Sequence, residues 1–122
     1  MAIAGLLALR PGLLVLDEPT AQLDPAGSRL VADALAGLAE AGASILIAEQ
    51  KTDLLAAICR RVLVLADGRV VLEGPAAEVL NDPRLEALGV AAPAAVRLAR
   101  AAESARVPDV ERERLRQAMV GA

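Results

Sequence analysis

The segment LLVLDEPTAQLDP, residues 13–25, carries most of the information about the fold. It opens with an unbroken apolar run, which is typical of a β-strand covered on both faces. The run ends in two adjacent carboxylates, Asp17 and Glu18, and a polar loop follows. Asp24 and Pro25 then supply an N-cap and a first-turn proline for a helix. The segment therefore predicts a strand, a loop and a helix in that order.

A second strand and a hairpin follow this helix, which is expected to end near Gly42. The segment SILIAE, residues 44–49, is again apolar, and a right-handed crossover would place its carboxyl end beside that of the first strand. Thr52 is a candidate N-cap for a short helix after it. Asp67 and Gly68 lie between two apolar runs and predict a two-residue hairpin turn. This order predicts an α/β fold, with a parallel sheet closed by an antiparallel hairpin.

The two ends of the chain are expected to be helical. AIAGLLALR is stopped by Pro11 and is read as the end of a helix. Prolines at positions 83, 93 and 108 should break the C-terminal third into short helical pieces. The last stretch, DVERERLRQAMV, is charged and has only a weak apolar stripe, which predicts a solvated helix or a frayed tail.

The composition limits the classes of protein. The chain has 122 residues, so it forms one domain at most, and it is 56% hydrophobic without any aromatic residue. Its net charge is −3 with both signs mixed along the chain, which argues against a nucleic-acid surface. No apolar stretch reaches the roughly 18 residues of a spanning helix, so we expect a soluble chain or one held to a membrane by partners. Cys59 is the only cysteine and is expected to be a small buried helix residue.

Asp17 and Glu18 are the main candidates for chemistry, because strand ends in α/β folds are where ligands bind. Adjacent carboxylates repel each other, and a divalent cation would relieve that repulsion. Mg²⁺ favours one or two carboxylates together with phosphate and water. Asp17 would hold the ion through water, and Glu18 would orient and polarise an attacking water. The alternative is that both acids cap the loop and lie in solvent.

The full string from residue 13 to 25 resembles the Walker B motif and D-loop of ABC-type ATPases. In that family the aspartate at the position of Asp17 coordinates Mg²⁺, and the glutamate at that of Glu18 is the catalytic carboxylate. Asp24 matches the D-loop aspartate, which communicates across the dimer of nucleotide-binding domains. The segment ILIAEQKTDLL resembles the following strand and helix, and it places Gln50 where the family has a switch histidine.

The resemblance extends over about residues 1 to 100. VLVLADGRVVLEG resembles the terminal hairpin of the family, and GPAAEVLND resembles its next helix. DPRLEALGVAAPAAVRLARA resembles the C-terminal extension of energy-coupling-factor ATPases of the vitamin or cobalt/nickel type. The implied fold is the C-terminal part of a P-loop NTPase sheet with a terminal hairpin. The expected division is a nucleotide-binding part, 1–82, and a helical extension or tail, 83–122.

The resemblance implies an ATP-hydrolysing subunit of a membrane importer that uses Mg²⁺ and ATP. Its partners would be a second ABC ATPase domain and a transmembrane transporter subunit, with no nucleic acid, at the cytoplasmic face of the membrane. Two alternatives stay open: a fragment of a non-transport ABC ATPase, and an interaction module or remnant without catalysis.

Several family motifs are missing from these residues. The chain contains no G-x-x-x-x-G-K-[ST] phosphate loop, no Q-loop and no LSGGQ segment. We therefore interpret it as a C-terminal half, which should expose strand edges and apolar surface and should not bind ATP measurably alone. An amide at Gln50 can donate a hydrogen bond but cannot transfer a proton as imidazole does. This predicts slow hydrolysis with ATP-driven dimerisation retained in a full-length parent; the alternative is a tolerated variant with normal activity.

Overall fold

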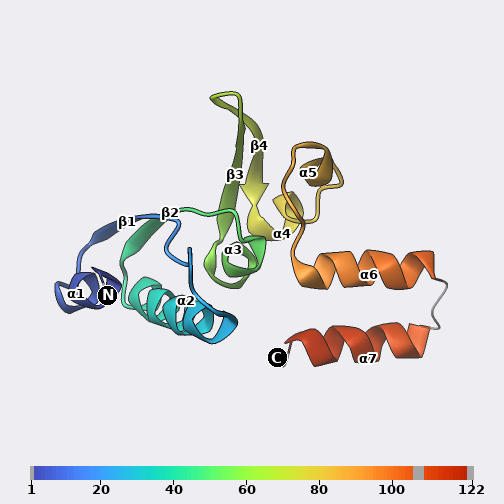
Figure 1. Ribbon diagram of the computed structural model, residues 1–122, viewed down its shortest axis with the longest axis horizontal. Helices are drawn as coiled ribbons and strands as arrows, with labels where there is room; N and C mark the ends of the chain where they lie inside the picture. Colours follow the sequence, from blue (N-terminus) through green and yellow to red (C-terminus); the bar gives the residue numbers. More distant parts are fainter. Residues whose placement is uncertain (1, 106–108, 121–122) are drawn as a thin grey trace.

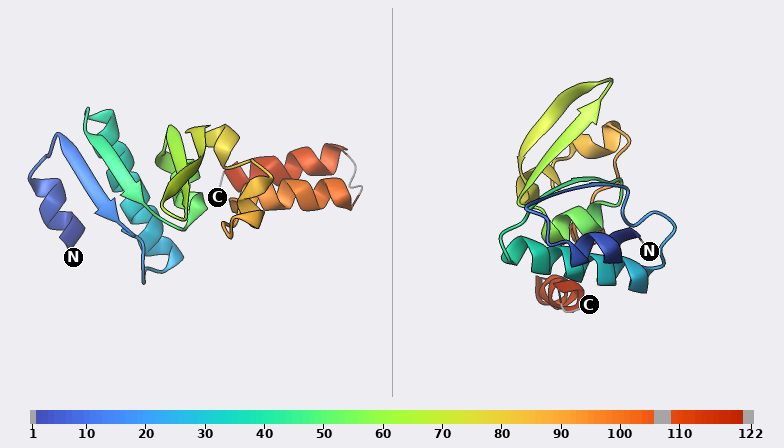
Figure 2. Two further views of the ribbon diagram at one scale, coloured as in Figure 1. Left: turned by 90° about the horizontal axis from the view of Figure 1, so that it is seen from above. Right: turned by 90° about the vertical axis from the view of Figure 1, so that its left-hand side faces the viewer.

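The computed structural model describes residues 2–105 and 109–120, which form a row of three groups of elements (Figure 1). The strands are β1 (Leu13–Asp17), β2 (Ser44–Ala48), β3 (Arg61–Ala66) and β4 (Arg69–Pro75). The helices are α1 (Ala2–Ala8), α2 (Pro25–Glu40), α3 (Thr52–Ile58), α4 (Ala76–Val79), α5 (Arg84–Ala87), α6 (Ala94–Ser104) and α7 (Asp109–Val120). Figure 2 shows β1, β2 and α2 in one group, with α6 and α7 at the opposite end.

The strands β1 and β2 pair in parallel over their whole length and are connected by α2. Alternate residues of β1 are buried: Leu14 and Leu16 pack with Val31 and Leu35 of α2. The other face of the two strands is open, and it exposes Leu13, Val15 and Leu46 by 64%, 63% and 57%. Both strands are confirmed, but only one face is covered. Within residues 2–105 and 109–120, each strand also has a single hydrogen-bonded neighbour, as expected of a sheet with open edges.

Helix α2 starts as the sequence predicts. The Asp24 carboxylate accepts a hydrogen bond from the amide of Gly27 at 2.7 Å, and Pro25 occupies the first turn. The helix ends at Glu40, and Gly42 follows with a φ of +99°, a conformation that favours glycine. These local signals fix both ends of the helix that leads from β1 to β2.

The strands β3 and β4 form the predicted hairpin. Asp67 and Gly68 have φ values of +51° and +73°, which suits a two-residue turn whose twist matches the strands. The described residues place β3 beside β4 alone and β2 beside β1 alone, so the hairpin does not close the parallel sheet as the sequence suggested. The hairpin packs instead against α3, α4 and α5: Leu55 of α3 lies in its core, which places β3 beside these helices and away from the edge of β2.

The hairpin core extends into the C-terminal segment. Leu85 of α5 is fully buried together with hairpin residues and α4. The division at residues 82/83 remains a prediction. Helices α5 and α6 begin directly after Pro83 and Pro93, as predicted, whereas Pro108 lies outside the described residues. Helix α7 is mostly exposed beside α6, which matches the predicted solvated helix. Of the helices in the described ranges, none has the length and apolarity needed to cross a membrane.

Candidate functional site

The carboxyl ends of β1 and β2 meet at one edge of the parallel sheet. Asp17 is the last residue of β1 and lies opposite Ala48, the last residue of β2. The pairing continues one step further, because the amide of Glu18 donates to the carbonyl of Ala48 at 2.8 Å. Asp17 and Glu18 are both exposed there. The two strand ends that sequence reasoning placed together are therefore adjacent.

Glu18 and Gln50 touch each other directly. Nε2 of Gln50 donates a hydrogen bond to Oε1 of Glu18 at 3.2 Å, and the two residues are 32 positions apart. Both side chains are exposed, so a ligand at this edge could reach them. The geometry thus unites the two candidate catalytic residues, and their roles remain predictions.

Glu18 has an unusual backbone conformation. Its φ is +46°, a left-handed value that costs a non-glycine residue of the order of 1–3 kcal/mol and persists only where surrounding contacts impose it. It opens a turn in which its carbonyl accepts from the amide of Ala21 at 3.0 Å. The turn continues through Gln22, whose φ is +63°. The carboxylate is therefore held on a tight turn and not on a regular strand.

Glu49 is a hydrogen-bonding centre that sequence reasoning missed. Its Oε2 accepts from the hydroxyl of Thr20 at 2.7 Å and from the Thr20 amide at 3.4 Å. Its Oε1 accepts from the amides of Gln50 and Lys51 at 2.9 and 3.1 Å. Burial raises the pKa of the Glu49 carboxyl, but these hydrogen bonds outweigh it, and the net pKa is lowered. The only sequence signal was an acidic residue at the end of an apolar run.

Lys51 supplies a second link between the same two segments. Its Nζ donates to the carbonyl of Thr20 at 2.7 Å. Thr20 is fully buried, and its hydroxyl, amide and carbonyl all face the 49–51 segment. The only lysine of the chain is therefore a structural contact to the loop after β1.

Asp24 and Thr52 have other partners. The Asp24 carboxylate caps its own helix through Gly27 and leaves Asp24 exposed beyond the turn. Thr52 does not cap α3 as expected: it is the first helical residue, and Lys51 at the N-cap makes no side-chain bond. The buried Thr52 hydroxyl donates instead to the carbonyl of Ala91 at 2.7 Å. A long-range acceptor has replaced the local one.

The residues present fit a magnesium ion that is bound together with a phosphate substrate. The described part of the chain contains no group of three or more His, Cys, Asp or Glu side chains able to form a metal cage. Mg²⁺ does not need one, because it usually takes one or two carboxylates and completes its shell with water and phosphate. Asp17, exposed at the strand end, provides such a carboxylate.

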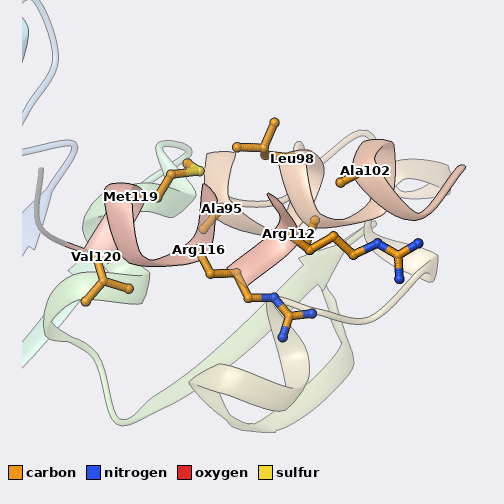
Figure 3. Close-up of a pocket in the computed structure, with 8 residues that line it drawn as sticks. Ala95, Leu98, Ala102, Arg112, Arg116, Met119 and Val120 are labelled. Atoms are coloured by element: carbon orange, nitrogen blue, oxygen red, sulfur yellow. The ribbon is translucent and has the colours of Figure 1, made fainter. Parts of the chain in front are cut away.

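Two cavities lie away from this edge. One, of about 200 Å³, lies between α6 and α7 and is lined by apolar side chains with Arg112 and Arg116 (Figure 3). The other, of about 220 Å³, is apolar and lies between α1, Leu23 and α2. Neither is lined by Asp17, Glu18 or Gln50. The candidate site is therefore an open sheet edge.

Comparison with known proteins identifies relatives of this chain. A scan against protein-family models gave no match. The chain is 43% identical over 100 residues to the energy-coupling factor transporter ATP-binding protein EcfA2 of Symbiobacterium thermophilum. The matched region covers 81% of this chain and 35% of that protein. It is 46% identical over 82 residues to the cobalt import ATP-binding protein CbiO of Rhodobacter capsulatus, covering 67% and 29%.

A solved structure gives the same result. CbiO1 of Clostridium perfringens, part of the ABC transporter complex CbiONQ, superimposes with a TM-score of 0.58 at 40% identity, covering 69% of this chain and 34% of that one. The chain thus spans about a third of the length of the curated relatives it matches. It belongs to the ATP-binding subunits of ABC transporters, of the energy-coupling-factor and cobalt-import type, and corresponds to a part of such a subunit consistent with its C-terminal half.

Proposed function

We propose that this chain carries the water-activating part of an ATP-hydrolysis site in an ABC importer. The observation that carries the proposal is the contact between Glu18 and Gln50 at the joint carboxyl end of β1 and β2. It places a carboxylate and a hydrogen-bond donor at the sheet edge where α/β folds bind ligands. The similarity to ATP-binding subunits supports ATP as the substrate.

Asp17 is proposed to hold Mg²⁺ through water, since it is an exposed carboxylate at the strand end. The ion, when bound, would neutralise part of the charge on the phosphates of ATP. Asp17 and Glu18 then have different tasks, although they are neighbours. Asp17 binds the magnesium ion, and Glu18 orients the attacking water.

Glu18 is proposed to accept the hydrogen bond of the attacking water and to turn it toward the terminal phosphate. Gln50 holds one oxygen of Glu18 and leaves the other for water. Its amide can donate to a phosphate oxygen but stays neutral and passes no proton. We therefore expect slower hydrolysis than an imidazole would support, with nucleotide-driven dimerisation retained.

The partners are proposed from the same relatives. Asp24, exposed at the start of α2, would contact a second ATP-binding domain. A transmembrane transporter subunit would be driven by the opening and closing of the two ATP-binding domains, because the relatives are named as parts of transporters. The subunit would then lie at the cytoplasmic face of the membrane. The isolated 122 residues, which contain no phosphate loop, should show no ATP binding by calorimetry.

A chimera tests the proposal. This chain would replace the matching 100 residues of the Symbiobacterium thermophilum relative, and ATP turnover would be titrated with Mg²⁺. Asp17→Asn should raise the Mg²⁺ concentration needed for half-maximal turnover by about tenfold or more, because it removes the charge that attracts the ion. Asp33→Asn, at an exposed position in α2, is the matched control. The proposal is contradicted if both variants require the same Mg²⁺ concentration as the unmodified chimera.

A further inference from the structure

The Glu49 carboxylate lies between the two segments that carry the candidate catalytic residues. One of its oxygens accepts from Thr20, in the turn that begins at Glu18. The other accepts from the amides of Gln50 and Lys51, at the end of β2. A single side chain therefore bonds to both sides of the Glu18–Gln50 contact.

An ionised carboxylate fits this position better than a neutral side chain does. Its four partners are all donors: the Thr20 hydroxyl and the amides of Thr20, Gln50 and Lys51. A carboxylate accepts at both oxygens, whereas a glutamine amide has one accepting oxygen and one NH₂ group. Turned toward Gln50 and Lys51, the NH₂ group would face two amide donors; turned toward Thr20, it could donate to the hydroxyl oxygen but would still face the Thr20 amide. The carboxylate alone accepts from all four donors.

The hydrogen bonds of Glu49 hold the turn that begins at Glu18, whose backbone is in an unfavourable conformation. The φ of Glu18 is +46°, and such a conformation persists where surrounding contacts impose it. Thr20, two residues further along, is the buried anchor of that turn. Lys51 adds a tether from its Nζ to the carbonyl of Thr20. The turn is thereby fixed from the β2 side and not from β1 alone.

We propose that Glu49 is a positioning residue, which joins the turn after β1 to the end of β2 and thereby sets the contact between Glu18 and Gln50. Glu49 itself does not touch substrate in this scheme. The catalytic meaning of the inference rests on the proposed function, whereas the structural coupling does not.

The test uses the 122-residue chain without nucleotide and follows it by NMR. The readouts are the side-chain amide signals of Gln50 and the hydrogen exchange of the Gln50 and Lys51 backbone amides. Glu18→Ala provides the reference for a Gln50 side chain that lacks its partner. In Glu49→Gln, the Gln50 side-chain signals should move to the reference position, and exchange of the two amides should become about tenfold faster or more.

Variants at threonine separate positioning from general destabilisation. Thr20→Val keeps the shape and removes the hydroxyl, so it should act like Glu49→Gln, and Thr20→Ser should restore the Gln50 signals. Thr52→Val removes the other buried threonine hydroxyl, which bonds to Ala91. It should lower stability and leave the Gln50 signals in place. If Thr20→Val unfolds the chain, Lys51→Met at an exposed position replaces it and should also shift the Gln50 signals.

Unchanged Gln50 side-chain signals in Glu49→Gln would overturn the inference, as would an equal shift in Thr52→Val. Neither result bears on ATP chemistry, because no nucleotide is present. Conversely, intact coupling in this experiment together with no effect of Asp17→Asn in the chimera would overturn the proposed function alone.

Discussion

The parallel pair β1–β2 and the hairpin β3–β4 solve different problems with strands of similar apolar content. In the described residues both are two-stranded, with each strand paired on one edge only, and both expose large apolar side chains. In β1–β2, side-chain hydrogen bonds gather at the carboxyl ends of the strands. The hairpin closes on itself through Asp67 and Gly68 and surrounds its own core with α4 and α5. Both sheets therefore have an apolar core, and the side-chain hydrogen bonds that join two strand ends are found at β1–β2.

One polar contact from each region illustrates the difference. Arg61 and Glu73 pair across β3 and β4 at 2.8 Å, with side chains that remain 67% and 54% exposed. Such a pair contributes little, because water screens it. Thr20 and Glu49 are partly shielded from water, and their donors and acceptors are matched. The Thr20–Glu49 contact therefore fixes the position of the loop after β1 relative to the end of β2, whereas the Arg61–Glu73 pair fixes little.

The largest expected effects come from the two cores. Leu35 and Leu85 are both fully buried, one under β1 and the other under the hairpin. Leu35→Ala and Leu85→Ala should each lower the free energy of unfolding by about 2–5 kcal/mol in urea denaturation. Hydrogen exchange should quicken mainly in β1–β2 for the first and in β3–β4 for the second. Ile47 packs against both cores and could couple them. If either variant accelerated hydrogen exchange equally in both sheets, the two sheets would unfold as one cooperative unit, and the distinction between them would be contradicted.

A pH titration can compare the two regions through one carboxylate in each: Glu49 at the end of β2 and Asp82 after α4. The Arg84 guanidinium and amide hold the pKa of Asp82 at about 2, below its ordinary 3.8, while Glu49 has a pKa lowered from 4.5 after hydrogen bonding outweighs burial. Both groups stabilise the fold above their ordinary pKa values, and that stability is lost as the pH falls through the lowered ones. Carbon-detected NMR titration should show Arg84→Ala returning Asp82 toward 3.8 without changing Glu49.

In that titration, protection of the Gln50 and Lys51 amides should disappear as Glu49 gains its proton, because a neutral carboxyl accepts less well. Persistence of this protection below the pKa of Glu49 would show that the carboxylate does not hold the segment.

The smallest effects should come from exposed positions. Arg61→Ala should change the free energy of unfolding by less than about 1 kcal/mol. Val15→Thr, on the bare face of β1, should stay within about 0.5 kcal/mol in the isolated chain. In the chimera the same threonine should be more costly if the added chain covers this face. Equal costs in both proteins, measured by urea denaturation, would mean that the face stays open.

Local signals predicted much of this structure, and long-range contacts account for what they missed. The strand 13–17, the Asp24–Pro25 helix start and the Asp67–Gly68 turn depend on neighbouring residues, so the sequence displays them directly. The partner of Thr52 is 39 positions away and that of Thr20 is 29 positions away, so both hydroxyl contacts could not be read locally.

The candidate site was predictable in its residues and not in its bonding. The resemblance named Asp17, Glu18 and Gln50, and the parallel pairing of β1 and β2 brings Glu18 and Gln50 into contact. Glu49 carried no motif of its own, because its importance comes from four donors that converge on it only in the folded chain. The division into two sheets was also missed, since both hairpin strands are as apolar as the sheet strands.

The role of Glu18 is tested most directly by single-turnover ATP hydrolysis in the chimera. Glu18→Gln keeps the size of the side chain and removes its basicity, so the rate should fall by about 10²- to 10⁴-fold while ATP binding is retained. Glu40→Gln, an exposed change at the end of α2, is the matched control and should leave the rate unchanged. A Glu18→Gln rate equal to that of the control would contradict the assignment of this sheet edge as the hydrolytic site.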